Sequence, residues 1–180
     1  TMVSTPNKYQ AGTIEGINPS RDIKVIPGKI FGNMIEAAQS HPRKRKMTDF
    51  TKDPSTNSMQ TLINTWMDGS FSPVHRHTEY SEAFVTLKGA LAFFTFTNEG
   101  THTCHIISDI TPEADRVIIV EKNAWHAMTA APVTKGWPGY AIVFESSGHS
   151  FNPKEPTKEL AQFAPILGDG MDGDPNYFQM

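Results

Sequence analysis

The chain has 180 residues, and its 16 basic and 19 acidic side chains give a formal net charge of −3 at pH 7. This length suits one domain with a core of its own, and the charge argues against a protein whose whole surface binds nucleic acid. The single cysteine, Cys104, excludes an intramolecular disulfide, so we expect a reducing, cytoplasmic location. No secretory leader is visible and no apolar run approaches about 20 residues, so no membrane partner is expected.

The first part of the chain predicts a surface arm followed by one short helix. Residues 1–26 are polar and interrupted by glycine and proline, which favours an arm on the surface. Apolar residues recur at helical spacing over 28–40. This helix should end before His41-Pro42, because proline disfavours helix at the residue before it. The basic run 43–46 then predicts a solvated turn, and a polar loop should follow at about 51–58.

From residue 59 onward the chain predicts an all-β domain. Short runs rich in Val, Ile, Phe, Thr and Tyr alternate with turn residues, which favours a barrel or sandwich over βαβ units. The expected strands are 60–67, 73–78, 82–88, 91–97, 101–108, 116–121, 125–130 and 139–146. Asn98-Glu99-Gly100 indicates a hairpin turn. A helical stretch is expected at 156–164 and a flexible tail at 167–180, so the domain should span 27–166.

The segment that starts at Gly69 and ends at Gly89 carries the strongest chemical signal. Five residues separate Gly69 from His75, and His77 follows two positions later. Alternate side chains of a strand share a face, so the two imidazoles should lie side by side. Four further residues can bend the chain and bring Glu82 to the same centre. Two imidazoles and one carboxylate suit a divalent transition metal and leave coordination positions open.

Two further residues bear on this predicted metal site. His126 is the candidate third imidazole, because it follows the strand-like run Arg-Val-Ile-Ile-Val and a turn-like Glu-Lys-Asn-Ala. Glu79 is a rival carboxylate, two residues after His77. Glu82 opens a strand, whereas Glu79 lies in the expected bend. The spacing of the first cupin motif, which this segment resembles, also selects Glu82.

These residues resemble the first motif of the cupin family, and the match is complete at the ligand positions. The second cupin motif is degenerate: His126 is in place, and Asn123 stands where a glycine belongs. Asparagine is the residue that best tolerates a left-handed turn after glycine. Glu121, Asp115 and Ala130 replace the motif's proline, leading glycine and final asparagine.

The chain is also similar to the WbuC-type cupin-fold metalloproteins. The similarity is carried by a helix before an Arg/Lys cluster, the run 73–77, the pair Trp125-His126, Phe144-Glu145 ahead of Gly148, and the closing 163–165. It implies a single jelly-roll barrel with one metal ion held by three histidines and one glutamate. The ion would be Fe, Mn, Zn or Ni. The resemblance implies no reaction.

Several other polar residues have competing interpretations. Arg43 or Arg45 could fold over the barrel mouth and pair with an anionic substrate on the metal, or lie in a solvated turn. Glu145 could bind substrate, orient a ligand imidazole or be structural. Arg76 should face outward, because it lies between the two histidines on a strand, and form an outer ion pair. Cys104 and its neighbouring histidines lack the second pair that a structural zinc site needs.

The functional expectation is a metal-binding cupin with a small-molecule partner. The partner would be an oxygen-bearing metabolite, either an anionic acid or a sugar derivative, bound at the open metal positions. An enzyme would use the metal as a Lewis acid, in an isomerase-type reaction, or to activate dioxygen, in an oxygenase-type reaction. The alternatives are a non-catalytic binding or sensor module and a structural cupin stabilised by metal. We expect no nucleic-acid partner, and a homodimer through an exposed sheet edge.

Overall fold

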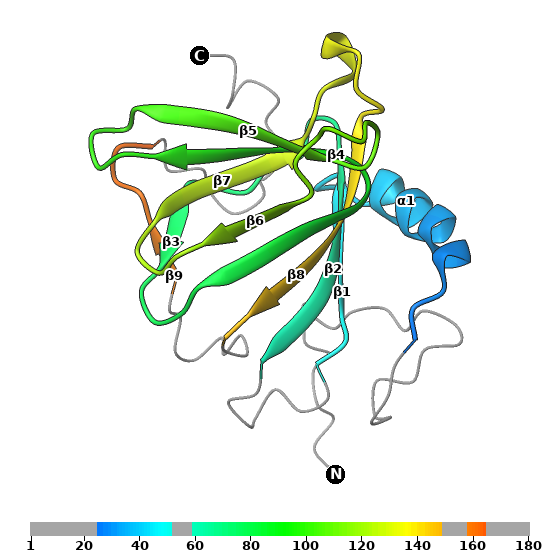
Figure 1. Cartoon of the computed structure of the whole chain (residues 1–180), viewed down its shortest axis with the longest axis horizontal. Helices are drawn as coiled ribbons and strands as arrows, with labels where there is room; N and C mark the ends of the chain where they lie inside the picture. The colour runs from blue at the N-terminus through cyan, green and yellow to red at the C-terminus, as the bar shows by residue number, and fades with distance from the viewer. Residues whose placement is uncertain (1–24, 52–58, 149–157, 165–180) are drawn as a thin grey trace.

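Alternating apolar and polar residues build about half of the described chain into strands. The computed structural model describes residues 25–51, 59–148 and 158–164. Its elements in chain order are η1 (Gly28–Ile30), α1 (Phe31–Ser40), β1 (Arg45–Asp49), β2 (Gln60–Met67), β3 (His75–His77), β4 (Glu82–Phe96), β5 (His102–Ser108), β6 (Val117–Val120), β7 (Trp125–Ala130), η2 (Val133–Lys135), β8 (Tyr140–Ser147) and β9 (Lys158–Leu160). The described chain is thus all-β apart from one α-helix and two short 3-10 turns (Figure 1).

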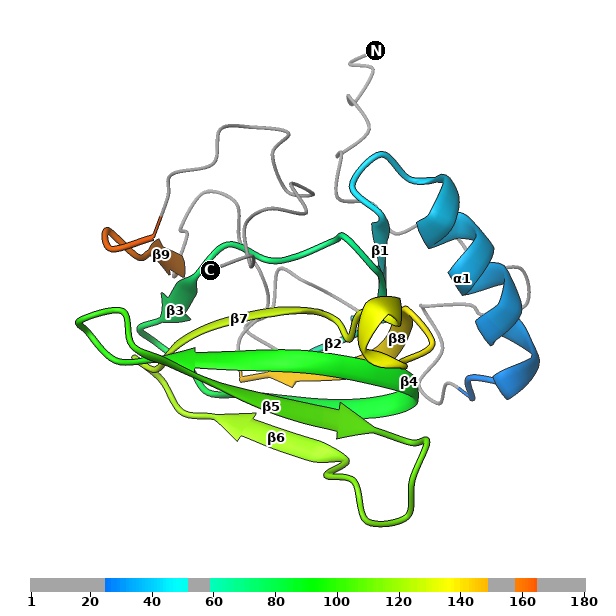
Figure 2. The same ribbon diagram turned by 90° about the horizontal axis from the view of Figure 1, so that it is seen from above.

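The strands form one curled, antiparallel sheet. Its order is β1-β2-β8-β4-β7-β3-β9, and β5 and β6 also pair with β4. The first half of β4 pairs with β6 and β8, whereas its second half pairs with β5 and β7. Figure 2 shows the two halves of the sheet curling around a common interior. We conclude that the protein has the all-β cupin barrel predicted from its sequence.

A bend in β4 allows one strand to serve both halves of the barrel. The register against β8 shifts between Thr86 and Lys88, which is a β-bulge. Gly89 follows at φ +88°, and a Cβ atom there would lie 2.2 Å from the carbonyl oxygen of Tyr140. The sequence predicted two strands, 82–88 and 91–97. The structure joins them into one, because a bulge and a glycine bend a strand without ending it.

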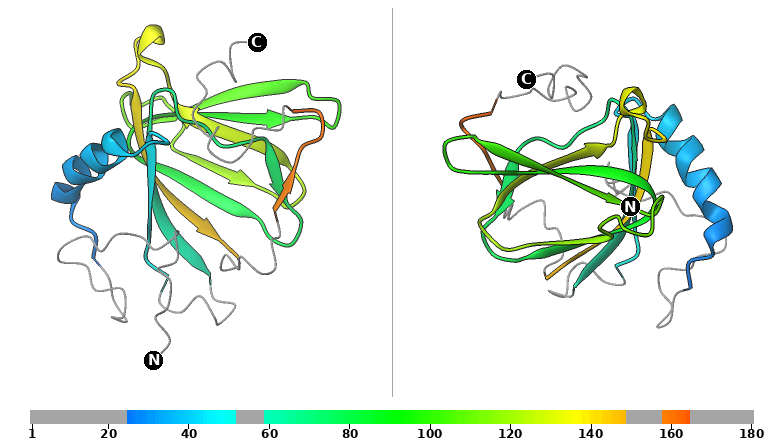
Figure 3. Two further views of the ribbon diagram at one scale, coloured as in Figure 1. Left: turned by 180° about the vertical axis from the view of Figure 1, so that it is seen from behind. Right: turned by 45° about the horizontal axis from the view of Figure 1, so that its top comes forward.

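Side-chain alternation divides the apolar residues between the barrel interior and an outer layer. The interior cluster contains the buried aromatics Trp66, Phe84 and Phe93. Ile63 and Ile142 point to the other face of β2 and β8, where they pack with Ile30 and Met34 beside α1. Figure 3 shows α1 lying outside the sheet, over β1 and β2. Each such apolar side chain contributes about 1.5–3 kcal/mol when fully buried.

Three further predicted elements differ from the structure. The basic run expected as a solvated turn enters strand β1, which pairs with β2 from Arg45 onward. The helical stretch expected at 156–164 is wrong for its described part, because 158–160 is strand β9 and pairs with β3. The strand expected at 73–78 is shorter and covers 75–77. Pairing with partners distant in sequence overrides local propensity in the first two cases.

The other expectations fall into two groups. The helix at 28–40 and the hairpin at 98–100 are confirmed, the latter with Gly100 at φ +88°. The predicted tail at 167–180 and nearly all of the arm at 1–26 lie outside the described residues. Among the helices of the described chain, none combines the length and the apolar character needed to cross a membrane.

Candidate metal centre

Three strands bring the predicted ligands to one place inside the barrel. His75 and His77 open and close β3, and Glu82 is the first residue of β4. His126 lies on β7 directly opposite His75, in an antiparallel pair. Opposite residues of an antiparallel pair share a face, so both imidazoles point inward. Glu79, the rival carboxylate, does not join these residues. Its side chain is exposed, and its carboxylate accepts a hydrogen bond from Thr78.

The turn before β7 has the geometry that its sequence suggested. Asn123 adopts a left-handed conformation, with φ +69°. Its backbone N–H donates a 2.7 Å hydrogen bond to the carbonyl oxygen of His77. This contact links the turn that precedes His126 to the strand that carries the other two histidines. Asparagine therefore adopts here the left-handed conformation that favours glycine at the corresponding position of the cupin motif that this turn resembles.

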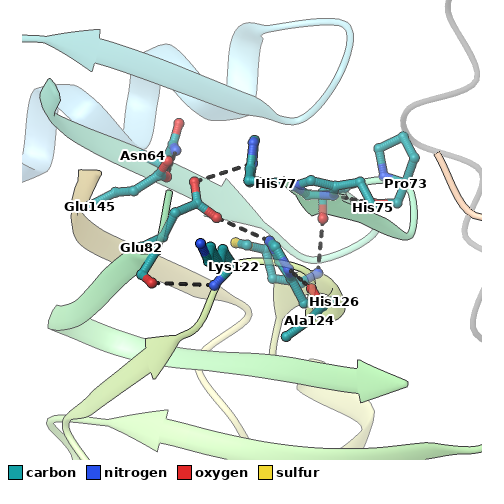
Figure 4. Close-up of polar contacts among 12 residues, drawn as sticks. Asn64, Pro73, His75, His77, Glu82, Lys122, Ala124, His126 and Glu145 are labelled. Carbon is teal, nitrogen blue, oxygen red and sulfur yellow. Dashed lines mark hydrogen bonds and ion pairs between the residues drawn. The ribbon is translucent and has the colours of Figure 1, made fainter. Parts of the chain in front are cut away.

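The four predicted ligands form one cluster of donor atoms. One ligand atom from each of His75, His77, Glu82 and His126 can be chosen so that all four lie within 4.8 Å of one another. The ring centroid of His75 is 4.2 Å from that of His126 and 5.2 Å from that of His77. Figure 4 shows the imidazoles and the carboxylate facing a common point. A single cation at this point would be within reach of all four.

Backbone carbonyls set the tautomers of two of the histidines. Nδ1 of His75 lies 2.7 Å from the carbonyl oxygen of Pro73, and Nδ1 of His126 lies 2.9 Å from that of Ala124. A carbonyl oxygen can only accept, so each Nδ1 carries the proton. Each Nε2 therefore presents a lone pair toward the cluster, as a metal-binding imidazole requires.

The contact between His126 and Glu82 fits a bound cation. Nε2 of His126 lies 3.2 Å from Oε2 of Glu82, and both atoms are buried without a hydrogen-bond partner. Two lone-pair acceptors at this distance repel each other unless a positive charge lies between them. His77 Nε2 lies 3.3 Å from the other oxygen of the same carboxylate, and its Nδ1 is also buried without a partner. The donor set therefore fits a metal ion.

Burial keeps the histidines of β3 neutral. The pKa of His75 lies well below 6.5, chiefly because its side chain is buried, with a smaller contribution from the positive charge of Lys158. Burial likewise lowers the pKa of His77 to about 4, although the Glu82 carboxylate partly opposes this shift. Only a neutral imidazole can donate its lone pair to a metal. Both side chains are thus ready to bind an ion at neutral pH without first losing a proton.

Aromatic side chains enclose the cluster. Phe93 stacks on His126, with a centroid distance of 5.6 Å and an interplanar angle of 11°. Tyr80 stacks on His77 at 4.6 Å. Phe84 adds a third ring, 6.3 Å from that of His126. These contacts restrict the imidazole rotations and place apolar surface on the inner side of the site.

Glu145 lies near the cluster, on β8. It faces Asn64, whose Nδ2 donates a 2.7 Å hydrogen bond to its carboxyl group (Figure 4). Burial and then the charge of Glu82 raise the pKa of Glu145 to about 8, so the carboxyl group is largely protonated at pH 7. The sequence singled out Glu145 but gave no signal for Asn64, because only the pairing of β2 with β8 brings the two together.

The predicted anion-binding arginines have partners within the protein. Arg45 Nη1 donates to the carbonyl oxygen of Phe71 at 2.9 Å, and its guanidinium lies 4.8 Å from the centroid of the Trp66 ring. The backbone N–H of Arg43 donates to Nδ1 of His41 in the turn before β1. The role of Arg43 and Arg45 toward a substrate stays a prediction.

Sequence comparisons give one partial match. A family model described as a domain of unknown function, DUF6016, matches residues 26–107. No curated protein matches the chain.

Solved structures are similar to the chain at the level of the fold. CapF of Staphylococcus aureus, a capsular polysaccharide assembling protein, has a TM-score of 0.52 and 17% identity, over 64% of this chain and 31% of CapF. Protein SO0799 of Shewanella oneidensis has a TM-score of 0.53 and 16% identity, over 71% and 82%. Oxalate oxidase in complex with the substrate analogue glycolate has a TM-score of 0.51 and 14% identity, over 73% and 62%.

These likenesses concern architecture, because all three identities are below 25%. The chain spans about a third of the length of CapF. The neighbours are cupin-fold proteins, in agreement with the barrel and with the inward-facing donor cluster described above. The protein is therefore a cupin-fold barrel with three histidines and one glutamate gathered in its interior.

Proposed function

We propose that the protein holds one divalent transition metal through His75, His77, Glu82 and His126, and binds a small oxygen-bearing metabolite on it. The observation that carries this proposal is the unpartnered pair His126 Nε2 and Glu82 Oε2, 3.2 Å apart and buried. Leaving two buried acceptors face to face costs free energy that a cation between them would recover.

The donor types limit the choice of metal. Imidazole nitrogens and a carboxylate oxygen suit Fe, Mn, Zn or Ni, whereas Ca²⁺ and Mg²⁺ prefer oxygen ligands alone. Four protein ligands leave one or two positions of an octahedral ion for a small chelating molecule. An anionic acid or a sugar derivative has oxygens suited to those positions. When bound, the metal would supply Lewis-acid or redox chemistry at the ligand oxygens.

The surrounding residues would position the small molecule. Phe84 and Phe93 exclude water from the inner side of the cluster. Asn64 and the protonated Glu145 offer hydrogen bonds to oxygen atoms of a ligand that extends toward β8. The glycolate bound to oxalate oxidase, a fold neighbour, is one small hydroxy acid of the proposed size. We also propose membership of the WbuC-type group, on the sequence similarity described above.

The test is elemental analysis of protein purified without added metal, with two matched variants. We expect about one equivalent of a transition metal in the wild type and little in His126→Gln. The control is His102→Gln, an exposed histidine of β5 outside the cluster, which should keep the metal. Equal metal in both variants, or none in the wild type, would contradict the proposal. Turnover of a panel of hydroxy acids and sugar derivatives would then separate an enzyme from a non-catalytic binding module.

A further inference from the structure

The strand that carries two residues of the donor cluster is short and has few partners inside the barrel. β3 pairs with β7 through one residue pair, His75 with His126, and the backbone N–H of Asn123 adds a hydrogen bond to His77. On its other edge, β3 pairs with β9 at all three of its positions. Figure 2 shows β9 running alongside β3 at this edge of the barrel. The segment 158–164, here called the C-terminal strap, therefore supplies most of the strand pairing of β3 in the described chain.

Side-chain and backbone contacts fasten the strap to β3 and its neighbours. Arg76 and Glu159 lie opposite each other, and their side chains form an ion pair with an Nη2–Oε2 distance of 2.7 Å. The guanidinium of Arg76 also lies 4.4 Å from the centroid of the Trp125 ring on β7. After β9, Ala161 is buried and its N–H donates a 3.0 Å hydrogen bond to the carbonyl oxygen of Val74. The outward ion pair predicted for Arg76 is thus confirmed, and it joins the strap to the strand that carries the two histidines.

Phe163 attaches the end of the strap to two further strands. The centroid of its ring lies 5.7 Å from that of Trp125 on β7 and 6.0 Å from that of Phe96 on β4. A Cβ atom added to Gly100 would lie 3.2 Å from the Phe163 ring, so the glycine of the hairpin turn leaves room for this ring. Phe163 is 37% exposed and lies outside the interior apolar cluster. Its contacts therefore serve the strap and not the core of the barrel.

We propose that the C-terminal strap positions the histidines of β3 for the metal, with Arg76 and Phe163 as its positioning residues. The proposal rests on the metal centre proposed above. Without the strap, β3 would keep one residue pair with β7, so the imidazoles of His75 and His77 would lose their fixed separation from the other ligands. The apparent metal affinity falls in proportion to the fraction of molecules in which the binding arrangement is formed. Both positioning residues would act through β3, without contacting the ion.

The test is calorimetric titration of the metal-free full chain with manganese(II) and with zinc(II). We expect Phe163→Ala to bind each ion about tenfold more weakly than the wild type, the size of a typical coupling between two sites. Phe163→Tyr keeps the ring and should bind as the wild type does. The matched control is Phe31→Ala, because Phe31 packs in the outer layer beside α1. This control should lose stability and keep its metal affinity.

A second variant separates positioning from electrostatics. Arg76→Gln removes a positive charge beside β3, which by charge alone would strengthen the binding of a cation. It also removes the ion pair to Glu159, and we expect binding about twofold weaker, in line with the small effect of an exposed ion pair. Far-ultraviolet circular dichroism of each variant checks that the barrel is folded.

The outcomes distinguish this inference from the metal centre itself. Unchanged metal affinity in Phe163→Ala would overturn the positioning role of the strap and leave the metal centre standing. Equal weakening in Phe31→Ala would also overturn it, because a general loss of stability would then explain the effect. Stronger binding in Arg76→Gln would overturn the role of Arg76. A wild type that binds neither ion would overturn the proposed function and, with it, this inference.

Discussion

Replacing Glu82 with glutamine should remove the metal and yet stabilise the metal-free protein. In the wild type, the two carboxylate oxygens face Nε2 atoms of His126 and His77 at 3.2 and 3.3 Å. Nε2 of His126 is an acceptor, because Nδ1 of that ring donates to Ala124. A glutamine amide at the same position can turn its NH₂ group toward this acceptor and satisfy it. The variant also lacks the only acidic side chain among the four residues of the donor cluster.

The size of the effect follows from the contacts that change. One new buried hydrogen bond contributes about 1 kcal/mol, and the loss of an uncompensated buried carboxylate adds to this gain. We therefore expect metal-free Glu82→Gln to be about 1–2 kcal/mol more stable than the metal-free wild type. Metal at about 100 times its dissociation constant would stabilise the wild type by about 2.7 kcal/mol. The order of stability should consequently reverse when metal is added.

The assay is urea denaturation of both proteins at pH 7.5, once with a chelator and once with metal in excess, together with elemental analysis. The prediction is a higher midpoint for the variant with chelator and for the wild type with metal. A metal-free variant less stable than the metal-free wild type would refute the tautomer assignment. Full metal occupancy in the variant would refute the role of Glu82 as a ligand.

Four further predictions test the site and the fold. His77→Ala should lose the bound metal but keep the far-ultraviolet circular dichroism spectrum of a β-protein, because the barrel core is a separate apolar cluster. Loss of that spectrum would instead indicate that the ion is needed for folding. Bound metal should persist from pH 8 to about pH 5 and decline as the pH falls toward 4, where the His77 imidazole takes up a proton and no longer binds the ion. Elemental analysis from pH 8 to below pH 4 measures this decline, and occupancy that is unchanged at the lowest pH would contradict a histidine-rich site. Metal-free protein should lose stability as the pH falls from 6.5 toward 4. The pKa values of His75 and His77 are lowered in the folded state, so the unfolded chain binds more protons in that window. Urea denaturation should show the free energy of unfolding falling by about 1.4 kcal/mol per pH unit for each histidine. Gly89→Ala should lower the free energy of unfolding by about 2–4 kcal/mol, since the residue has φ +88° and an added Cβ would clash with the Tyr140 backbone. An unchanged denaturation midpoint would disprove the need for a glycine at this bend.

Local patterns in the sequence, together with the resemblance to the cupin motifs, predicted the donor cluster. The i, i+2 spacing of His75 and His77 determines a shared strand face, whatever the rest of the fold. Glu82 opens the next strand-forming run, and His126 follows a turn whose asparagine tolerates a left-handed backbone. The helix at 28–40 was also predictable, because its apolar stripe and the proline after it are features of the local sequence.

Contacts between distant segments were not predictable in the same way. The single strand β4 arises because a bulge and Gly89 bend the chain while its pairing with β8 continues. Asn64 meets Glu145 only through the register of β2 against β8, and no spacing in the sequence encodes that register. The stretch containing Lys158 predicted helix, yet it pairs with β3, because strand pairing depends on a partner about 80 residues away.

The sequence by itself therefore determined the β class and the identity of the four side chains in the donor cluster, since alternation, turn chemistry and motif spacing all lie within short segments. The tertiary structure decided which charged and polar groups surround those side chains. Asn64 and Glu145 come from two separate strands, and the pairing of β2 with β8 is what brings them together. Such contacts depend on distance in space and not on separation along the chain, because electrostatic and hydrogen-bonding interactions act over a few ångströms.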